Sequence, residues 1–533
     1  MKIHGTKYGA VLLFAIFSVC LSLGGVSPIY AQEGDTDSEE SPTLLEQITV
    51  TAGAPVPGSP LDQPSQIDVV TGDELKREGG AGLGQSLDHL PGVSSVSTGN
   101  NVGKPSIRGL TGNQIQVISD GIGVDHQQFG TRHPPNIEPF LSDSLEVVRG
   151  PASIQYGSGA IGGAVNVTGL PIEFHNRDRR QTEYESLFGF KTNNDQFDAG
   201  LKFQSVGKRW SFSGGVIDRS AGNIETPNEP TSLPPGPPSD RPAYTGELDN
   251  TDFDQTNAQI GVGYRDDDNE FRVRYKRWRN EHNFLLPPPA GDQPPAVQEG
   301  MGQNLETDNV KLSGKLPWSN DLVLKPSFNW QNNLRQSNAP GNPRSQLFDG
   351  AIDVEFDQYT YRLQLEHRDN LFGFFDEGQL GVEYTEKDQV SRGTTQLTPG
   401  GEVTNLGLYA FEERSIHDWT FQLGLRHDVH ETIGDEGKTS APTIFSGQVE
   451  NDYSVTTGSL GVSYKVSDKL TLAGNVAEGF RAPTLFELFA DGVHGGVAAV
   501  QRGEPSLDEE ESLNTDLSLR YRTPDLTFSA TVY

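Results

Sequence analysis

The chain has 533 residues, 34% of them hydrophobic, and its formal net charge of -32 excludes a basic surface for nucleic acid. Beyond the N-terminus, no apolar run reaches the roughly 18 residues of a membrane-spanning helix, which excludes a bundle of such helices. A soluble protein and a β-barrel both remain, because barrel strands show only alternating hydrophobicity.

Residues 1–31 predict a cleaved secretory signal. Lys2 and Lys7 precede an apolar stretch that ends near Leu23, and an acidic stretch follows. A retained helical anchor is the alternative, but the apolar stretch is short for one. Cys20 is the only cysteine and lies in this segment, so the mature chain is expected to contain no disulfide.

Residues 58–172 predict a compact α/β domain that begins with two helical signals. Thr71 and Glu74 have the spacing of a capping box at the head of a short helix. A second helical stripe follows and is ended by a Pro-Gly pair, at Leu83, Leu87, Leu90, Pro91 and Gly92.

Three short strands and a hairpin turn are predicted in the same domain. The strands cover residues 106–109, 115–118 and 145–148, and Asp120-Gly121 is a dipeptide that favours a hairpin turn. A domain of this size ahead of a wide barrel could fill the lumen that the barrel leaves open.

From about Tyr184 the sequence becomes a long series of alternating segments, each about nine or ten residues long. In residues 196–204, for example, large apolar side chains occupy one face and polar side chains the other. About fifteen such segments follow up to Tyr533. The alternation predicts a mainly β protein with a transmembrane antiparallel β-barrel over residues 180–533.

The connections between these segments alternate in length. Short turns on one rim and long loops on the other are typical of an outer-membrane barrel, because backbone polar groups at membrane depth must pair within a closed sheet. A soluble β-sandwich also alternates within its strands but does not need this alternation of loops. Short turns are expected near 205–208, 265–269, 318–321, 466–469 and 523–525, and long segments near 218–250, 280–306, 335–350, 388–402, 428–453 and 478–511.

Several motifs resemble those of the TonB-dependent receptors of Gram-negative outer membranes, and the resemblance covers nearly all of the mature sequence. Residues 145–167, LEVVRGPASIQYGSGAIGGAVNV, are the most specific match. Residues 480–483 and 503–507 are similar to landmarks around a long extracellular loop, although the second departs from the common form. The resemblance assigns an energy-coupling TonB box to Ile48, Thr49, Val50, Thr51 and Ala52, and a plug signature to Arg108, Gly109, Asp120, Gly121, Arg149, Gly150 and Pro151.

The resemblance also implies a location and a partner. Residues 32–57 would form a periplasmic coupling segment and residues 58–172 a plug inside the barrel, which spans the outer membrane. The partner would be a TonB-type energy-transducing complex of the inner membrane. Family barrels have about twenty-two strands, so the resemblance implies that about seven are missing and that the chain is a C-terminally truncated fragment; an unpaired last strand fits this.

Gly157, Gly159 and Gly162 match the pattern G-x-G-x-x-G, but a dinucleotide site is not expected. No strand leads directly into the motif, and no acidic residue follows about twenty positions later in a βαβ unit. The glycines are expected to allow tight turns and close backbone packing within the plug.

Histidines indicate the ligand. His126 and His133 follow the predicted hairpin, and His494 lies between the two barrel landmarks. In the resembled family these regions face the extracellular side, so the resemblance implies that they converge; the segments around His133 and His494 are similar to its zinc-uptake branch. Imidazole with carboxylate suits zinc, and a single imidazole can ligate haem iron. Unliganded surface histidines are the alternative. The hypothesised metal or ligand set is His126, His133, His494, Asp125, Glu138 and Asp491.

The other histidines are weaker candidates. His427 and His430 are three residues apart on a predicted strand, so they point to opposite faces and would form a metal pair only if the strand ended between them. His367 and His417 fall near predicted short turns, on the rim away from the long loops.

Two functional classes stay open. The first is active import of a scarce metal or metal chelate, with zinc or haem favoured and a ferric siderophore, bound by Arg, Tyr and Trp of the loops, as the alternative. The second is a passive pore or adhesin, which needs neither a coupling box nor a plug. An enzyme is not expected, because no nucleophile, base and orienting group occur together by spacing. The expected partners are outer-membrane lipid and a small metal-containing ligand, with no permanently bound cofactor.

Overall fold

The computed structural model describes most of the chain beyond residue 62. The described residues are 63–97, 101–125, 127, 133–225, 246–248, 250–285, 300–339, 342–344, 348–368, 373–394, 397, 400–435, 449–494 and 499–533. The chain divides into two units, Met1–Gln47 and Ile48–Tyr533, and every described residue belongs to the second. The predicted secretory signal and TonB box lie outside the described residues.

The plug, residues 63–172, is built on a five-stranded sheet with the order β1-β7-β8-β5-β6. Strands β5 and β8 pair in parallel, and the other neighbours are antiparallel. A second sheet joins β2, β3 and β4. The elements are β1 (Gln66–Thr71), α2 (Gly72–Glu78), β2 (Val93–Ser97), β3 (Gly103–Ile107), β4 (Leu110–Thr111), η1 (Gly112–Gln114), β5 (Ile115–Ser119), β6 (Ile122–Gly123), η2 (Pro139–Leu141), β7 (Ser142–Arg149), α3 (Ser153–Tyr156) and β8 (Gly163–Gly169).

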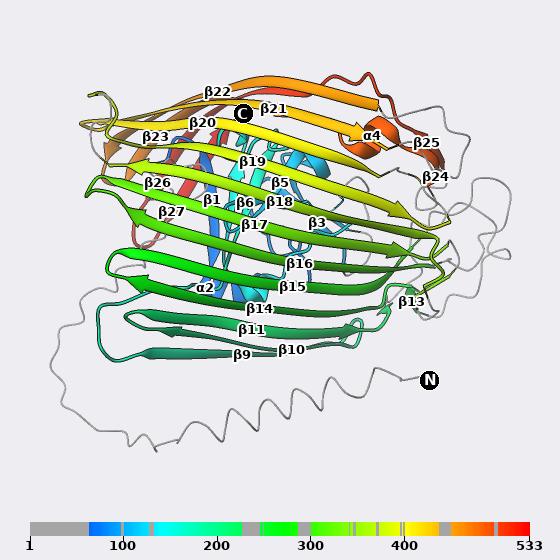
Figure 1. Ribbon diagram of the computed structural model, residues 1–533. Coiled ribbons are helices and arrows are strands. Elements are labelled where there is room, and N and C mark those ends of the chain that lie inside the picture. The colour runs from blue at the N-terminus through cyan, green and yellow to red at the C-terminus, as the bar shows by residue number, and fades with distance from the viewer. Residues whose placement is uncertain are drawn as a thin grey trace, which may run out of the picture. The chain divides into compact units, whose positions relative to one another are not determined.

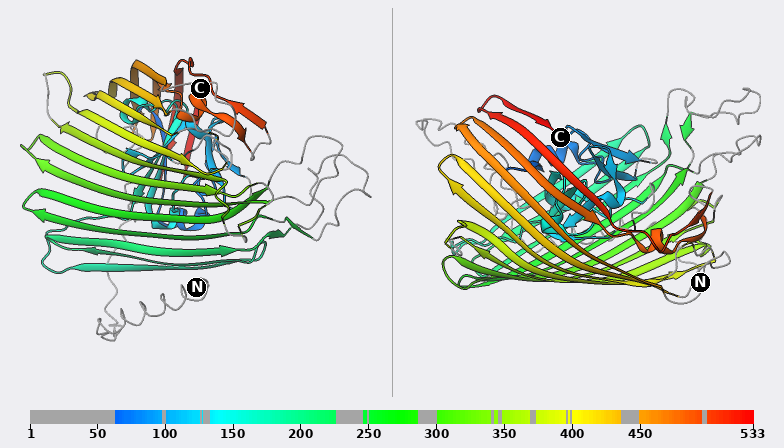
Figure 2. Two further views of the ribbon diagram at one scale, coloured as in Figure 1. Left: turned by 45° about the vertical axis from the view of Figure 1, so that its right-hand side comes forward. Right: turned by 90° about the horizontal axis from the view of Figure 1, so that it is seen from above.

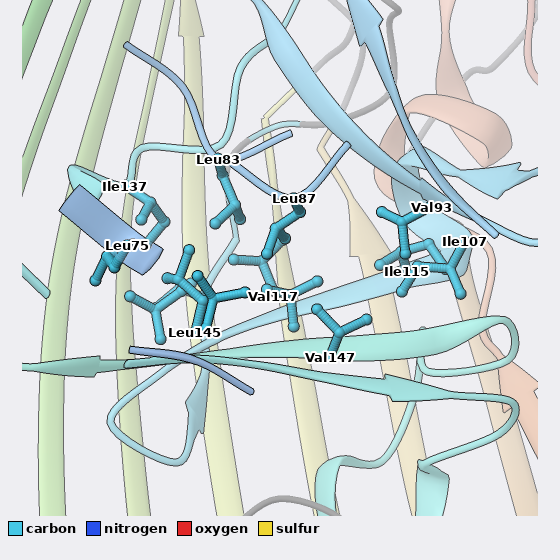
Figure 3. Close-up of a cluster of buried hydrophobic side chains, with 14 residues drawn as sticks. Leu75, Leu83, Leu87, Val93, Ile107, Ile115, Val117, Ile137, Leu145 and Val147 are labelled. Atoms are coloured by element: carbon cyan, nitrogen blue, oxygen red, sulfur yellow. The ribbon is translucent and has the colours of Figure 1, made fainter. Parts of the chain in front are cut away.

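Two apolar clusters hold the plug together, and Figure 3 shows the larger of them. Side chains from the sheet, from α2 and from the turns after it meet there, and Leu83, Leu87 and Leu145 are fully buried. Each buried aliphatic side chain of this kind contributes about 1.5–3 kcal/mol relative to an exposed one. The plug therefore has a core of its own, separate from its contacts with the surrounding strands.

The predicted hairpin is confirmed. Ser119 pairs with Ile122, and the two turn residues Asp120 and Gly121 have φ values of 52° and 83°. Both central residues of a type I′ turn need positive φ, which explains the Asp-Gly pair. The strands predicted at 115–118 and 145–148 correspond to β5 and β7, and the one predicted at 106–109 overlaps β3.

Two helical predictions need correction. Helix α2 follows Thr71 as expected, but the Thr71 side chain makes no capping hydrogen bond. The leucine stripe is not a helix: residues 81–90 form a series of turns. The reason is the glycine content of this stretch, since Gly79, Gly80, Gly82 and Gly84 disfavour a helix, and Gly84 packs so closely on β3 that a Cβ there would lie 2.7 Å from the carbonyl carbon of Lys104. The leucines still enter the core, which is why their spacing imitates a helix.

Fifteen antiparallel strands form the large sheet, which curves around the plug (Figures 1 and 2). The predicted number and antiparallel order are confirmed. Strands β27 and β9 lie at the two edges of the sheet. The strands are β9 (Gln181–Lys191), β10 (Gln196–Val206), β11 (Trp210–Ala221), β14 (Phe253–Asp266), β15 (Asn269–Leu285), β16 (Gly300–Pro317), β17 (Leu322–Ser337), β18 (Ile352–His367), β19 (Glu377–Arg392), β20 (Gly401–Ile416), β21 (Trp419–Gly434), β22 (Val449–Ser467), β23 (Leu470–Arg481), β26 (Glu510–Arg522) and β27 (Thr527–Val532).

Small elements lie between the long strands. Among the described residues, no helix is long and apolar enough to cross a membrane. The small elements are the strand pairs β12 (Ile224–Glu225) with β13 (Glu247–Leu248) and β24 (Asp491–His494) with β25 (Ala499–Arg502), and the helix α4 (Leu485–Phe489).

Many strands are longer than predicted. Strand β15 has 17 residues and β22 has 19. On β15 the outward face changes from apolar Phe271 and Val273 to Arg277, which pairs with Glu306 and Asp308 of β16. The outward face is polar beyond that point, so the hydrophobic alternation that marks a strand in the sequence ends before the strand does.

The glycines of the plug loop allow close packing, as expected. Gly157 has a φ of 69°, and a Cβ there would lie 2.8 Å from Nη2 of Arg426, which Asp428 holds by two hydrogen bonds. Gly92 has a φ of 72° and no atom within 4 Å of such a Cβ.

This difference gives a test of the packing. We expect Gly92→Ala to destabilise the protein by about 1 kcal/mol, because an L-residue pays only for its positive φ. Gly157→Ala should cost clearly more, because a φ of 69° with a ψ of -144° is a combination that glycine alone adopts readily, and because Arg426 must also move. The measurement is the thermal unfolding midpoint of each purified variant in detergent. Equal shifts would show that Arg426 does not restrict this loop.

Candidate functional site

A polar cavity of about 230 Å³ lies between the plug and the sheet. The plug hairpin, the loop after α3, the inner faces of β18 to β21, and the start of α4 all contribute to it. Its wall combines acids, cations, amides and one imidazole. The charged and polar residues that line it include Asp125, Gln127, Ser158, Gln358, Thr360, Glu383, Thr385, Lys387, Asn405, His430, Arg481 and Thr484.

His430 and His427 point to opposite faces of the sheet, as predicted, because β21 includes both residues. His427 is exposed on the outward face, and its Nδ1 lies 2.9 Å from Oγ1 of Thr456. His430 lines the cavity, and its Nε2 lies 3.2 Å from Oγ1 of Thr432. The spacing of this pair predicts their opposite orientation. It does not place His430 in a site, because the residues that line the cavity with it lie on other strands and in the plug.

Asp125 is the one member of the hypothesised ligand set that lines this cavity among the described residues. Its carboxylate lies 2.8 Å from Nζ of Lys387 and accepts a hydrogen bond from the backbone N–H of Gln127 at 2.7 Å. Asp125 thus joins the tip of the plug to β19.

His133 is buried in a contact between the plug and β17. Its Nδ1 lies within hydrogen-bond distance of the Gln127 carbonyl and 3.0 Å from Nη1 of Arg335. His126 lies outside the described residues, and so does the side chain of His494, whose backbone belongs to β24. Whether the three histidines converge stays a prediction.

Glu138 and Asp491 occupy other places. The buried Glu138 carboxylate accepts hydrogen bonds from Arg219 and Asn257, both at 2.9 Å, and also caps η2 through the N–H of Phe140. Its contacts are those of an anchor between plug and barrel. Asp491 is buried at the start of β24, 3.4 Å from Nε of Arg502.

The hairpin residue Asp120 forms ionic contacts with two strands of the large sheet. Its carboxylate pairs with Arg274 and Lys276 of β15, the latter at 2.7 Å, and Lys311 of β16 donates to its carbonyl. Burial alone would raise the pKa of Asp120, but the three cations outweigh it and hold the pKa well below its usual value. The tip of the plug is therefore fixed to the barrel by charge.

The other plug-signature residues make structural contacts. Arg149 pairs with Asp68 of β1 and donates to the carbonyl of Pro91 at 2.8 Å. Nη1 of Arg108 lies 2.8 Å from Oδ1 of Asp516 on β26. Gly109 and Gly150 have φ values of 85° and 82°. A Cβ on Gly479 would lie 3.0 Å from Pro151, so the signature packs directly on β23.

The plug motif at residues 145–167 contacts the barrel motif at residues 480–483 directly. The N–H of Ala482 donates to Oγ of Ser158 at 3.0 Å, and the N–H of Gly159 donates to the carbonyl of Phe480 at 3.0 Å. The N–H of Phe480 also reaches Oγ of Ser153 at 3.4 Å. The plug loop is thereby joined to the end of β23 at the edge of the cavity.

Arg481 extends this contact to α4. It donates to both carboxylate oxygens of Glu487, at 2.6 and 2.9 Å, and to Glu510 at 2.6 Å. Glu487 also completes a capping box with Thr484, the motif that the sequence suggested for α2 instead. Burial would raise the pKa of Glu487, but the hydrogen bonds from Arg481 lower it below its usual value.

Lys104 gives a pH-dependent prediction. Burial, and to a lesser extent the nearby charge of Arg335, lower the pKa of this plug lysine to about 7. Between pH 7 and pH 10 the unfolded chain holds a proton that the folded chain has lost, so raising the pH favours folding. From pH 7 to pH 9 the wild type should gain on the order of 2 kcal/mol relative to Lys104→Met. Unfolding midpoints of both proteins at the two pH values check this, and a constant difference between them would contradict it.

Two family models match the chain and together cover most of it. The model described as TonB-dependent Receptor Plug Domain matches residues 59–164. The model described as TonB dependent receptor-like, beta-barrel matches residues 169–533.

Curated relatives include receptors for iron-containing ligands. The hemin receptor of Yersinia pestis is 22% identical over 496 residues, covering 90% of this chain and 66% of the relative. The ferric enterobactin receptor of Pseudomonas aeruginosa is 24% identical over 592 residues, covering 98% of this chain and 72% of the relative. The chain thus spans about two thirds of the length of the relatives it matches.

Solved structures share the fold. The Serratia marcescens hemophore receptor HasR, in complex with its hemophore and heme, has a TM-score of 0.68 at 16% identity, covering 87% of this chain and 71% of that one. The copper transporter OprC has the same TM-score and identity, covering 89% and 72%. At this identity the likeness shows the plug-and-barrel fold alone.

Proposed function

Because the chain belongs to the TonB-dependent receptors of the Gram-negative outer membrane, we propose that it actively imports a metal chelate, with haem as the ligand that best suits it. The curated relatives of this chain are transporters and receptors, and an enzymatic role is not indicated. The observation that carries the ligand proposal is the cavity beside the plug tip, where an imidazole faces a space that is also lined by Lys387 and Arg481.

The chemistry of haem matches that wall. Haem iron takes an imidazole nitrogen as an axial ligand. Its propionates are anions that Lys387 and Arg481 attract by exchanging their present carboxylate partners, Asp125 for Lys387 and Glu487 with Glu510 for Arg481. Hemin receptors are among the relatives, which supports the same ligand. His126, His133 and His494 remain proposed ligand residues, together with Asp125. Glu138 and Asp491 belong to the same proposal with less support, because their described contacts are with arginines and amides of the protein.

Active import across the outer membrane needs an energy source outside that membrane. That membrane contains no ATP supply, so we assign energy transfer to a TonB-type inner-membrane complex that engages residues 48–52. A short β-branched stretch is suited to strand addition at a partner's sheet edge. A passive pore or adhesin would not need a plug with a fixed hairpin, so that alternative is disfavoured.

A ferric siderophore is the second candidate. The enterobactin receptor among the relatives favours it, and the cations beside the cavity would serve an anionic ferric chelate equally well. Zinc fits the histidine and carboxylate residues, but the relatives give it no specific support.

Calorimetry separates these ligands. The full chain in detergent is titrated with hemin, with Zn²⁺ and with ferric enterobactin, and only hemin is expected to bind tightly. Tight binding of ferric enterobactin without hemin binding would show that the ligand is a ferric siderophore and not haem. Binding heat with Zn²⁺ and with neither chelate would show that the ligand is the metal ion itself.

A further inference from the structure

Three cations of the barrel wall meet at the tip of the plug hairpin. Arg274 and Lys276 belong to β15 and Lys311 belongs to β16, and Arg274 is directly opposite Lys311 in the register of the two strands. All three contact the hairpin residue Asp120, so all three lie on the lumen side of the sheet. We call Arg274, Lys276 and Lys311 the cationic patch.

The cationic patch carries more positive charge than the plug neutralises. In the part of the chain that the structure describes, Asp120 is the only carboxylate paired with these cations, and it contacts Arg274 and Lys276. Lys311 donates to the Asp120 backbone carbonyl and not to the carboxylate. Like charges directly opposite each other destabilise a pair of strands. Three cations that share one carboxylate are therefore a cost to this sheet.

This excess is not a general property of the contacts between plug and barrel. Arg219 of β11 meets two carboxylates, Glu138 of the plug at 2.9 Å and Asp198 of β10 at 3.1 Å. That contact has no spare positive charge. The cationic patch differs from it in charge balance, and a purely structural anchor does not require such an imbalance.

Asp120 shows which chemical group fits the cationic patch. Its carboxylate lies 2.7 Å from Nζ of Lys276, contacts Arg274 and accepts a hydrogen bond from the backbone N–H of Gly169 at 2.8 Å. The side chains of Asp120 and Arg274 are only 10% and 11% exposed, so water and salt screen this contact weakly. Lysine and arginine form their strong hydrogen bonds with anionic oxygens such as these. The structure thus contains the patch with a carboxylate of the protein bound to it.

We infer that the cationic patch is a carboxylate-binding site of the lumen, which Asp120 occupies while the plug is docked. When the plug moves during import, a carboxylate of the transported chelate takes the place of Asp120. The cations exchange one carboxylate for another, so none of them loses its counter-charge. A haem propionate and the carboxylate of a ferric siderophore both provide this group. The exchange rests on the proposed function and deepens it, because it names a contact that the ligand makes on its way past the hairpin.

Chemical rescue tests the site without transport. Asp120→Gly removes the carboxylate and leaves its space empty, and glycine tolerates the φ of 52° at this position. Asp120→Asn is the matched control, because it removes the same charge but fills the space with an amide. The unfolding midpoint of each full-length variant is measured in detergent, with sodium formate and with sodium chloride at the same concentration.

Formate is expected to replace the missing carboxylate. It should restore at least half of the midpoint that Asp120→Gly loses, and it should restore nothing in Asp120→Asn. An Asp120→Gly protein that folds only when formate is present supports the site equally. Equal midpoints of this variant in the two salts, or no folding in either, would overturn the inference. Normal ligand uptake by the wild type would in that case leave the proposed import intact.

Lys311 allows a test of the exchange itself. Lys311→Gln keeps a donor for the Asp120 carbonyl but removes the charge, and Lys311→Arg keeps both. We expect Lys311→Gln to lower the maximal uptake rate of labelled hemin at least about threefold, because the lumen attracts the anionic group less strongly. Hemin affinity should stay unchanged, because the docked plug covers the patch, and Lys311→Arg should transport like the wild type.

A merely structural role of Lys311 would leave the uptake rate of Lys311→Gln unchanged, since the hydrogen bond to the hairpin is kept. Equal rates of the wild type and Lys311→Gln would therefore overturn the exchange. If the wild type imports neither hemin nor a ferric siderophore, the proposed function fails, and the exchange fails with it. Rescue by formate would still establish the carboxylate site.

Discussion

Deleting residues 48–52 is expected to reduce ligand uptake to the background of cells without the receptor while ligand affinity stays unchanged. The deletion removes the only segment assigned to the energy-transducing partner. The residues that line the cavity begin at Asn113 in the sequence, so the binding site is untouched. The measurement compares accumulation of iron from labelled hemin with hemin affinity for the same variant.

The control for this deletion has the same length. Deleting residues 36–40 shortens the acidic stretch before the box by five residues and should leave uptake intact. Equal uptake by the box deletion and the wild type would show that the segment does not couple energy. Loss of uptake in both deletions would mean that length, and not the box, matters.

Joining the plug loop to the barrel should block transport reversibly. Ser158→Cys combined with Ala482→Cys places two thiols where a 3.0 Å hydrogen bond now joins these residues, and Cys20 is the only native cysteine. A disulfide or a short reducible cross-linker between them would prevent the plug loop from separating from β23, so the ligand could not pass the plug. Uptake should fall to background when the link is closed and return after reduction.

Binding distinguishes this effect from damage to the site. The linked variant should still bind hemin, because the cavity exists while the loop is docked. Each single cysteine variant should transport like the wild type, with or without reductant. Full uptake by the linked variant would show that the ligand passes without separation of this loop from β23.

The barrel could be predicted from the sequence because lipid and lumen impose a period of two on every strand. The fifteen strands and the short turns follow from that pattern and from residues such as Asp120-Gly121, whose conformation few other pairs adopt. The strand ends could not be predicted, because outward-facing arginines and carboxylates such as Arg277 and Glu306 carry no hydrophobic period.

The site was less accessible to sequence reasoning. Histidines near the plug and the long loop could be singled out, but His430 enters the cavity only through its register with Asn405, 25 residues away. The position of Glu138 near His133 in the sequence suggests a ligand residue. Its partners Arg219 and Asn257 lie on β11 and β14, and the sequence around Glu138 does not predict contacts with strands so far along the chain. A contact between plug and barrel uses the same charged and polar residue types as a ligand site. The sequence alone therefore does not distinguish the two.

We propose that this receptor imports a metal chelate with energy from the inner membrane. The most direct measurement of this import is the accumulation of labelled iron supplied as hemin, in cells whose only haem receptor is this chain, with the inner-membrane proton gradient intact or collapsed by a protonophore. We expect accumulation above the external concentration with the gradient and only surface-bound ligand without it. Equal accumulation under both conditions would contradict the proposal.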